Sequence, residues 1–230
     1  MKLILIFIMS IVLQNCSKDY KNDENLSNSN IELPNDIRWV TNSSEYKILC
    51  EQIYYNAWNN ISQIINNSNS NSCIVMDLDE TVLDNSNYQI DLTEKNESYN
   101  PDSWSKWVNL KKAKLVPGAK EFINNIRKTN VKIVFLSNRM AKNEEPTKEN
   151  MKDLGILHSD DIFLLRRDKK DKKDIRRKEI LNGKGRMSKI GSLEVIAYFG
   201  DAKHDFPDLD KSYKFGNNMY MFPNPMYGKW

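Results

Sequence analysis

The feature that most constrains the fold is a short apolar run that ends in two carboxylates one residue apart. The run Cys73-Ile-Val-Met76 has the length of a buried strand, and Asp77 and Asp79 follow it. In a parallel α/β sheet, ligands bind beyond the carboxyl ends of the strands, so both acids are expected to face a site. As the chain leaves the sheet, the two side chains can point differently, which lets one attack while the other transfers protons. A helix cap would explain one acid but not three, because Asp84 lies in the same segment.

This segment also resembles a known signature. Asp77-Leu-Asp79-Glu-Thr81 resembles the D-x-D-x-T motif of haloacid-dehalogenase (HAD) phosphatases, and its extension to Asp84-Asn85 is similar to the class C acid phosphatases. That family is the secreted lipoprotein branch of the superfamily, with non-specific acid phosphatase and 5′-nucleotidase activities. The resemblance implies an α/β fold with a HAD-like Rossmannoid parallel sheet flanked by helices. It also implies a small cap, formed by an insertion at about residues 86–114 and by N-terminal helices.

Residues 1–15 have the pattern of a secretory signal peptide that is removed. Lys2 precedes an apolar run over residues 3–13. That run is shorter than the roughly 20 apolar residues that span a bilayer. The junction Leu13-Gln-Asn-Cys16 resembles a bacterial lipobox, which implies that Cys16 carries a lipid. An ordinary secretory signal with a cysteine nearby by chance is the alternative.

The residues after the signal divide into a tether and a domain. Residues 16–35 are rich in Asn, Ser, Asp and Lys, so they predict a flexible, lipidated tether. Residues 36–230 are enough for one α/β domain with a substantial core. We therefore expect an exported protein of the cell envelope, anchored through its lipid at the outer membrane or the cell surface. The formal net charge of +3 argues against binding of nucleic-acid polymers. A homodimer is possible, but the sequence does not decide the oligomeric state.

Apolar spacing predicts the elements around the first strand. It indicates one or two helices over residues 39–66, a helix beginning near Val116 and a helix over residues 149–157. Further strands are expected at residues 131–136, 161–165 and 195–199. Cys50 and Cys73 either pair in an oxidising compartment or stay reduced, with Cys73 a small buried side chain.

Two later motifs concern phosphate binding. Ser137-Asn138-Arg139 follows a predicted strand and resembles the second motif of the superfamily, which implies that Ser137 and Asn138 bind phosphate. Lys173-Asp-Ile-Arg176 resembles the K-x-x-R of the class C third motif, which implies that Lys173 is the catalytic cation.

The register of that lysine is uncertain from the sequence. Residues 166–178 hold nine basic and three acidic side chains, so Lys170 and Lys172 are alternatives to Lys173. Such a run usually forms a solvated face, and here its positive field could attract anionic substrates.

The fourth motif concerns the metal. Gly200-Asp201 follows a predicted strand, and the resemblance implies that Asp201 binds Mg²⁺ while Asp205 supports the metal shell. Ala202 stands where the family usually has Asn, which removes a hydrogen-bonding side chain. His204 adjoins Asp205, but with only His158 elsewhere the chain has no histidine cluster for zinc.

Two aromatic residues are candidates for substrate stacking. Trp104 and Trp107 lie three residues apart in the insertion and would share a helical face. The resemblance implies that Trp104 stacks on a nucleotide base or another ring, whereas Trp107 packs onto the domain. The ending P-N-x-x-Y-G-x-W is similar to class C enzymes and implies that Tyr227 faces Trp104 across the substrate. The alternative for Trp104 is simple packing onto the domain, and the alternative for Tyr227 is an aromatic C-terminal tail docked on the surface.

The resemblance implies a lipid-anchored, Mg²⁺-dependent acid phosphatase that hydrolyses phosphate monoesters, such as nucleoside 5′-monophosphates or other aromatic phosphates. Asp77 would form an aspartyl-phosphate, and Mg²⁺ would be bound by Asp77, the backbone carbonyl of Asp79 and Asp201. Asp79 would act as general acid and base, which predicts an acidic pH optimum. The alternative is a catalytically impaired surface-binding or adhesion lipoprotein on the same fold, because Ala202 departs from the family pattern.

Overall fold

The computed structural model describes residues 32–208 and 212–228. The predictions for the signal peptide, for Cys16 and for most of the tether lie outside these residues.

A five-stranded sheet with parallel neighbours organises the described part of the chain. Its order is β5-β4-β1-β6-β7, which places β1 at the centre between β4 and β6. The strands are β1 (Ser72–Met76), β4 (Lys132–Phe135), β5 (Ile162–Phe163), β6 (Glu194–Gly200) and β7 (Met219–Met221). The prediction of an α/β fold is confirmed. The four predicted strands differ from β1, β4, β5 and β6 only at their ends, whereas β7 was not predicted.

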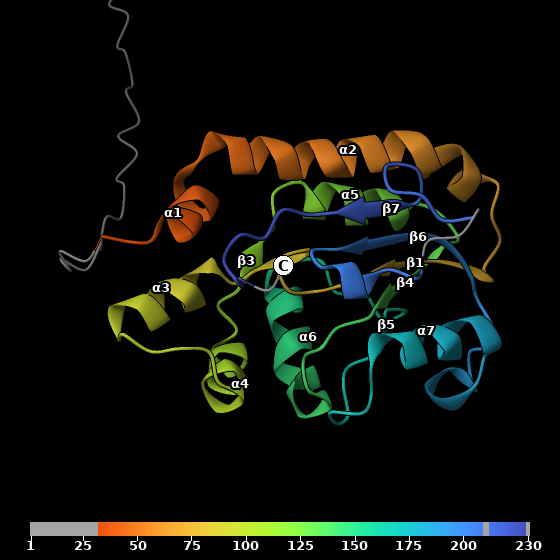
Figure 1. Cartoon of the computed structure of the whole chain (residues 1–230). Helices are drawn as coiled ribbons and strands as arrows, with labels where there is room; N and C mark the ends of the chain where they lie inside the picture. Colours follow the sequence, from red (N-terminus) through yellow and green to blue (C-terminus); the bar gives the residue numbers. More distant parts are fainter. Residues whose placement is uncertain (1–31, 209–211, 229–230) are drawn as a thin grey trace, which may run out of the picture. The chain divides into compact units, whose positions relative to one another are not determined.

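Side chains of β1 alternate between two cores on opposite faces of the sheet. The helices that cover the faces are α2 (Ser44–Asn66), α5 (Ala119–Ile126), α6 (Glu144–Asp153) and α7 (Lys173–Asn182). Ile74 and Met76 belong to the core under α2, α5 and α6, whereas Cys73 and Val75 belong to the core that contains Ile180 of α7. In Figure 1, α2 and α5 lie above the strands and α7 lies below them. The sheet is thus covered on both faces, which is typical of parallel sheets.

The predicted helical region over residues 39–66 forms two helices, α1 (Asn35–Asn42) and α2. Ser43 separates them and caps the second, because its Oγ accepts a hydrogen bond of 3.0 Å from the backbone N–H of Tyr46. Gly118 precedes α5 with a φ of +85°, and a Cβ there would lie 3.2 Å from the Cα of Glu51 in α2. Only glycine combines this backbone conformation with such a close approach of two helices.

The helix predicted over residues 149–157 is displaced toward the N-terminus in the structure. It begins at Glu144 and ends at Asp153. Its first turn contains Pro146 and only polar neighbours, so apolar spacing could not reveal it. Proline is tolerated there because the first-turn N–H groups have no partner inside the helix.

The two described cysteines are unpaired. Cys50 lies in the core under α2, and Cys73 belongs to the core on the opposite face of the sheet. Their side chains point into different cores, so a disulfide could not join them without movement of the backbone. The structure therefore agrees with the interpretation of Cys73 as a small buried side chain.

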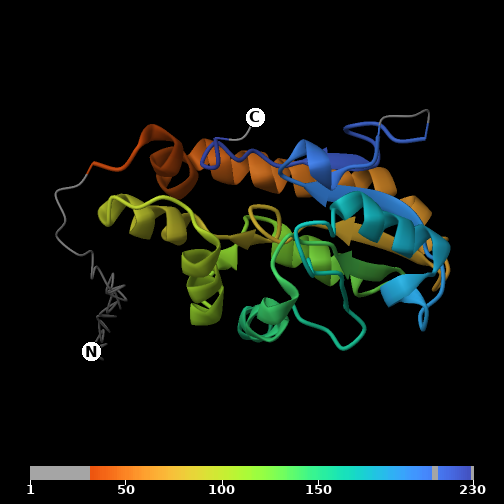
Figure 2. The ribbon, with the colours of Figure 1, turned by 60° about the horizontal axis from the view of Figure 1, so that its bottom comes forward.

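The insertion after the first motif forms a small unit on a two-stranded neck. β2 (Leu83–Asp84) pairs antiparallel with β3 (Lys114–Leu115), and α3 (Ser86–Glu94) and α4 (Pro101–Leu110) lie between them in the sequence. The unit has its own cluster of buried side chains, namely Tyr88, Leu92, Trp107 and Val108. Helix α1 contacts α3, and α4 contacts α6, as the two ribbon views show (Figures 1 and 2). This arrangement has the parts of the expected cap, an insertion together with an N-terminal helix.

Three short 3₁₀ helices complete the described elements: η1 (Ala141–Asn143), η2 (Gly185–Met187) and η3 (Lys203–Asp205). Within residues 32–208 and 212–228, no helix has both the length and the apolar character that crossing a membrane would require.

Candidate active site

The predicted site residues follow three neighbouring strands. Asp77 comes directly after β1, Ser137 and Asn138 lie just beyond β4, and Asp201 comes directly after β6. Because these strands are parallel neighbours, their carboxyl ends lie at the same edge of the sheet. Lys173 is the first residue of α7, and it reaches the same edge from the face of the sheet that α7 covers.

Lys173 links two carboxylates in the buried interior of the site. Its Nζ lies 2.6 Å from Oδ1 of Asp77 and 2.6 Å from Oδ1 of Asp205. Lys173 is only 4% exposed, so water solvates its charge poorly. Although burial works against the charged form, the two carboxylates raise the pKa of Lys173 above its usual value.

Three carboxylates converge at this point. Asp77, Asp201 and Asp205 each offer an oxygen atom, and these atoms all lie within 4.8 Å of one another. Burial, together with Asp205 and Asp79, raises the pKa of Asp77 to about 7 against the opposing effect of Lys173. Burial and the charges of Asp77 and Asp205 raise the pKa of Asp201 well above its usual value. In Asp205 burial also favours the neutral form, but Lys173 outweighs it and lowers the pKa.

The donor set fits a hard divalent cation. The three converging groups are carboxylates, and carboxylate oxygens are the ligands that Mg²⁺ and Ca²⁺ prefer. The nearest histidine, His204, is exposed, and its Nε2 lies 3.4 Å from Oδ1 of Asp205. One lysine among three converging acids leaves negative charge at the site, which a divalent cation would neutralise.

The loop after β6 is held by backbone and by a distant amide. Asp205 packs so closely over Gly200 that a Cβ at Gly200 would lie 2.3 Å from the Cβ of Asp205. The backbone N–H of Ala202 donates to Oδ2 of Asp205 at 2.9 Å. Nδ2 of Asn224 donates to Oδ2 of Asp201 at 2.7 Å. Although Ala202 offers no side-chain amide, Asn224 supplies one to the neighbouring acid.

Asp79 lies outside the cluster of three carboxylates and is held by a different set of side chains. Its Oδ1 accepts hydrogen bonds from Nε of Arg139 at 2.9 Å and from Nδ2 of Asn85 at 3.0 Å. The side chain is 14% exposed, so it keeps access to solvent.

Arg176 holds the loop that contains Ser137 and Asn138. The guanidinium is fully buried and donates from Nη1 to the carbonyl of Ser137 and from Nη2 to Oδ1 of Asn138, the latter at 2.8 Å. Nδ2 of Asn138 lies 3.1 Å from Nε2 of His204. In the K-x-x-R segment, lysine therefore reaches Asp77 while arginine positions the loop after β4.

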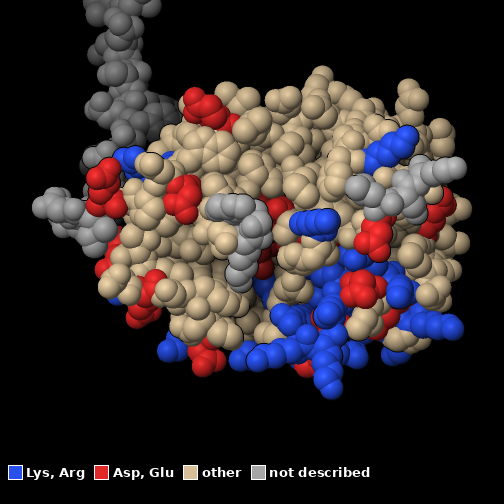
Figure 3. Space-filling model, viewed as in Figure 1, with Lys and Arg blue, Asp and Glu red and all other residues tan. Residues whose placement is uncertain are grey.

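The two alternatives to Lys173 lie elsewhere. Lys170 and Lys172 are exposed, so the structure brings Lys173 into the site and neither of them. The basic side chains of this run gather on the surface over α7 and the loop before it, as Figure 3 shows. The exposed members are Arg167, Lys169, Lys170, Lys172 and Lys178.

Trp104 and Tyr227 approach the site through different partners. The ring of Trp104 contacts Tyr88 edge-on at 5.0 Å and lies 5.8 Å from the guanidinium carbon of Arg139. The hydroxyl of Tyr227 donates to Oε2 of the buried Glu80. Among the described side chains, the rings that contact Trp104 are Tyr88 and Tyr99, so Trp104 and Tyr227 do not touch each other.

One family model covers all the residues of this site. A model of the family described as HAD superfamily, subfamily IIIB (Acid phosphatase), matches residues 15–230. The chain belongs to this family. It is an acid phosphatase, a phosphoric monoester hydrolase, and the resemblance to the class C enzymes is confirmed.

Two solved structures of the class C acid phosphatase from Bacillus anthracis are similar to this acid phosphatase. One of them has tungstate bound and is 27% identical, over 85% of this chain and 84% of that chain, with a TM-score of 0.70. The other is 27% identical with the same coverage and a TM-score of 0.71. The structural likeness therefore extends over most of both chains.

Sequence reasoning assigned no role to several residues that contact the site of this acid phosphatase. Arg139 and Arg176 belong to motifs that were recognised, but their contacts depend on the fold. Glu80 is 1% exposed, adopts a φ of +56° and accepts hydrogen bonds from the N–H of Asn85 and from Tyr227. A non-glycine residue in this region is held by its surroundings, and burial raises the pKa of Glu80 well above its usual value.

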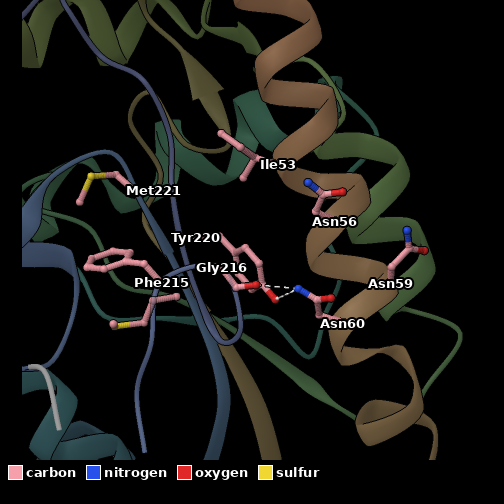
Figure 4. Close-up of a pocket in the computed structure, with 9 residues that line it drawn as sticks. Ile53, Asn56, Asn59, Asn60, Phe215, Gly216, Tyr220 and Met221 are labelled. Carbon is pink, nitrogen blue, oxygen red and sulfur yellow. Dashed lines mark hydrogen bonds between the residues drawn. The ribbon is translucent and has the colours of Figure 1, made fainter. Parts of the chain in front are cut away.

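A groove of about 720 Å³ lies between α2 and the segment around β7 (Figure 4). The close-up shows Asn60 of α2 pointing toward Tyr220, and its amide donates to the hydroxyl of Tyr220. The groove shares no lining residue with the carboxylate cluster, so it is separate from the active site.

Replacing Asn224 by Ala should weaken metal binding, because Oδ2 of Asp201 loses the donor that orients it. Residues that orient a metal ligand typically change metal affinity by about 10–100-fold, and we expect a loss near the lower end of that range. Isothermal titration with Mg²⁺ measures this affinity directly. Asn59→Ala, an exposed asparagine on α2, is the matched control, and equal affinities for the two variants would contradict the assignment.

The gain in stability produced by Mg²⁺ should increase with pH. The pKa of Asp77 is about 7 in the folded protein without metal. An unperturbed aspartic acid has a pKa of about 3.9. Between these values the folded state holds more protons than the unfolded state, so the free energy of unfolding falls as the pH rises. Mg²⁺ competes with those protons, so the Mg²⁺-dependent rise in unfolding temperature should grow from about pH 4 to about pH 7.

Thermal unfolding with Mg²⁺ and with a chelator, across this pH range, tests the prediction. Asp205 does not mask the effect, because its lowered pKa confines its own contribution to pH values below the window. A Mg²⁺ effect that is independent of pH would show that Asp77 and Asp201 do not titrate in this way.

Proposed function

We propose that this acid phosphatase is a Mg²⁺-dependent enzyme that forms an aspartyl-phosphate on Asp77. The observation that carries the proposal is the position of Asp77, which lies against Lys173 and within the cluster of three carboxylates. A phosphate monoester is anionic, so its attack by a carboxylate requires positive charge at the same place. Lys173 supplies one such charge, and a bound divalent cation supplies more.

The protein side chains divide the chemistry between them. A carboxylate oxygen of Asp77 attacks phosphorus, and the bond from phosphorus to the leaving oxygen breaks. Lys173, Ser137 and Asn138 bind the phosphoryl oxygens. Asp79 gives a proton to the leaving alcohol and later takes one from the water that hydrolyses the intermediate.

The metal site of the proposal consists of Asp77, the backbone carbonyl of Asp79, and Asp201. Bound Mg²⁺ would neutralise charge on the phosphoryl group and orient it for in-line attack. Asp205 supports this site by fixing Lys173, because its Oδ1 accepts from Nζ and its Oδ2 is occupied by the N–H of Ala202.

We further propose nucleoside 5′-monophosphates or other aromatic phosphates as substrates. Trp104 packs against Arg139 and Tyr227 bonds to Glu80, so both rings flank the acid motif from separate elements without touching. A flat ring placed between them would stack on both faces. Anchoring through a lipid on Cys16, a place in the cell envelope and a homodimer remain proposals from the sequence.

Purified full-length protein should release phosphate from a nucleoside 5′-monophosphate at mildly acidic pH when Mg²⁺ is present. A chelator should abolish the release, because the carboxylate cluster then lacks its neutralising cation. Asp77→Asn should lower the rate by at least about 10⁴-fold, because losing a nucleophile typically has an effect of that size.

A matched control is Asp84→Asn, which changes an acid of the same segment that lies outside the carboxylate cluster. Release by Asp77→Asn at the wild-type rate would refute the nucleophile. Release that is unchanged by the chelator would refute the metal dependence.

The rate should have its optimum at acidic pH and decline toward alkaline pH. The physical reason is that Asp79 must carry a proton when the leaving alcohol departs, and deprotonation of this acid removes that step. Measurement of kcat/KM for an alkyl phosphate from acidic to alkaline pH tests this expectation. A flat or alkaline profile would contradict the role of Asp79 as the acid.

A further inference from the structure

The carboxylate of Asp79 is held through one of its two oxygens only. Oδ1 accepts two hydrogen bonds, from Nε of Arg139 at 2.9 Å and from Nδ2 of Asn85 at 3.0 Å, and it also forms an ion pair with Nη2 of Arg139 at 2.8 Å. Oδ2 has no hydrogen-bond partner among residues 32–208 and 212–228. Arginine and a carboxylate commonly pair through both oxygens, so this one-sided arrangement is informative.

The donors on Oδ1 are themselves fixed. Arg139 is 1% exposed, and its Nη1 donates to Oγ1 of Thr147 in α6 at 3.0 Å. Asn85 is fully buried, and its Oδ1 accepts from Nε1 of Trp107 at 2.9 Å and from Nη2 of Arg139 at 3.3 Å. Each donor is therefore anchored to a separate helix, and neither can turn without breaking other buried hydrogen bonds.

We propose that Arg139 and Asn85 are positioning residues that immobilise Oδ1 of Asp79 and leave Oδ2 as the oxygen that carries the proton. This inference rests on the role proposed above for Asp79. In the first step Oδ2 gives its proton to the leaving oxygen, while the bond from Asp77 to phosphorus forms and the ester bond breaks. In the second step water attacks phosphorus and gives a proton to Oδ2, while the bond from phosphorus to the oxygen of Asp77 breaks. Phosphate leaves, Asp77 is again a carboxylate and Asp79 is again protonated.

The same two residues connect the acid to the cap. The guanidinium of Arg139 contacts Asp79 on one side and lies 5.8 Å from the ring centre of Trp104 on the other. Asn85 joins Asp79 to Trp107, the buried tryptophan of the cap. The acid is thereby fixed relative to the aromatic side chains that would receive the leaving group, and an error of about 1 Å in such a placement can cost about 10²-fold in rate.

Leaving groups provide a test that a purely structural role would not pass. A good leaving group such as 4-nitrophenolate needs little protonation, whereas an alkoxide needs it fully. We would measure kcat/KM of the Mg²⁺-loaded full-length protein for a series of phosphates between these extremes. The variants are Arg139→Lys, which keeps the charge but loses the planar fork, and Asn85→Ala, which removes the amide donor.

General acid catalysis contributes about 10²–10⁴-fold, so we expect each variant to lose about tenfold or more with alkyl phosphates and less than about threefold with 4-nitrophenyl phosphate. Asn59→Ala is the matched control, because Asn59 is an exposed asparagine of α2 that lines the groove separate from the active site. It should leave the dependence on the leaving group unchanged. If Arg139→Lys does not fold, Asn85→Ala decides by the same criterion.

Asp79→Asn separates the two possible failures. A steep leaving-group dependence in Asp79→Asn, with an equal loss for all substrates in Arg139→Lys and Asn85→Ala, would overturn the positioning role alone. No steepening in Asp79→Asn would overturn the role of Asp79 as the acid, and the inference would fall with it.

Discussion

The buried ammonium group of Lys173 is the interaction on which the active site depends. It lies between Asp77 and Asp205 at 2.6 Å from each, and all three side chains are almost fully buried. Carboxylates packed this closely repel one another, and a buried charge without a partner costs several kcal/mol. Lys173 makes the cluster tolerable without neutralising it completely. The site therefore has more carboxyl groups than cations, and the raised pKa values of Asp77 and Asp201 allow them to hold protons that a divalent cation would displace. A second buried cation, Arg139, pairs with Asp79.

The parts of this site that the sequence could reveal are those that follow from local patterns. A short apolar run before Asp77 and Asp79 identified the central strand, and the order of the later motifs identified the strand ends that meet it. Lys173 could be chosen over its neighbours only by resemblance, because charge alone does not distinguish it from Lys172.

The contacts that hold the site in place had no such local signal. Asn224 and Asp201 are 23 residues apart, and Arg139 and Asp79 are 60 residues apart. Hydrogen bonds between distant residues leave no periodicity, so their partners emerge only when the chain is folded. The predicted start of α6 was wrong for a different reason. The first turn of this helix is polar, so it shows no apolar spacing. The departure at Ala202 was judged only from its missing side-chain amide. In the fold, the backbone N–H of Ala202 donates to Asp205 and the amide of Asn224 donates to Asp201, so both contribute to the site.

The central position of β1 has a consequence for how the enzyme comes into being. Its two neighbours, β4 and β6, lie far along the chain, and β6 is followed only by η3 and β7 among the described elements. During synthesis β1, which precedes Asp77, has at least one edge with unpaired backbone N–H and C=O groups until β4 and β6 are made. Such an edge can pair with other chains. Long-range parallel pairing is also slow, because loop closure must precede the contacts that reward it. Because Asp201 and Asp205 follow β6, the carboxylate cluster cannot form until β6 has joined the sheet.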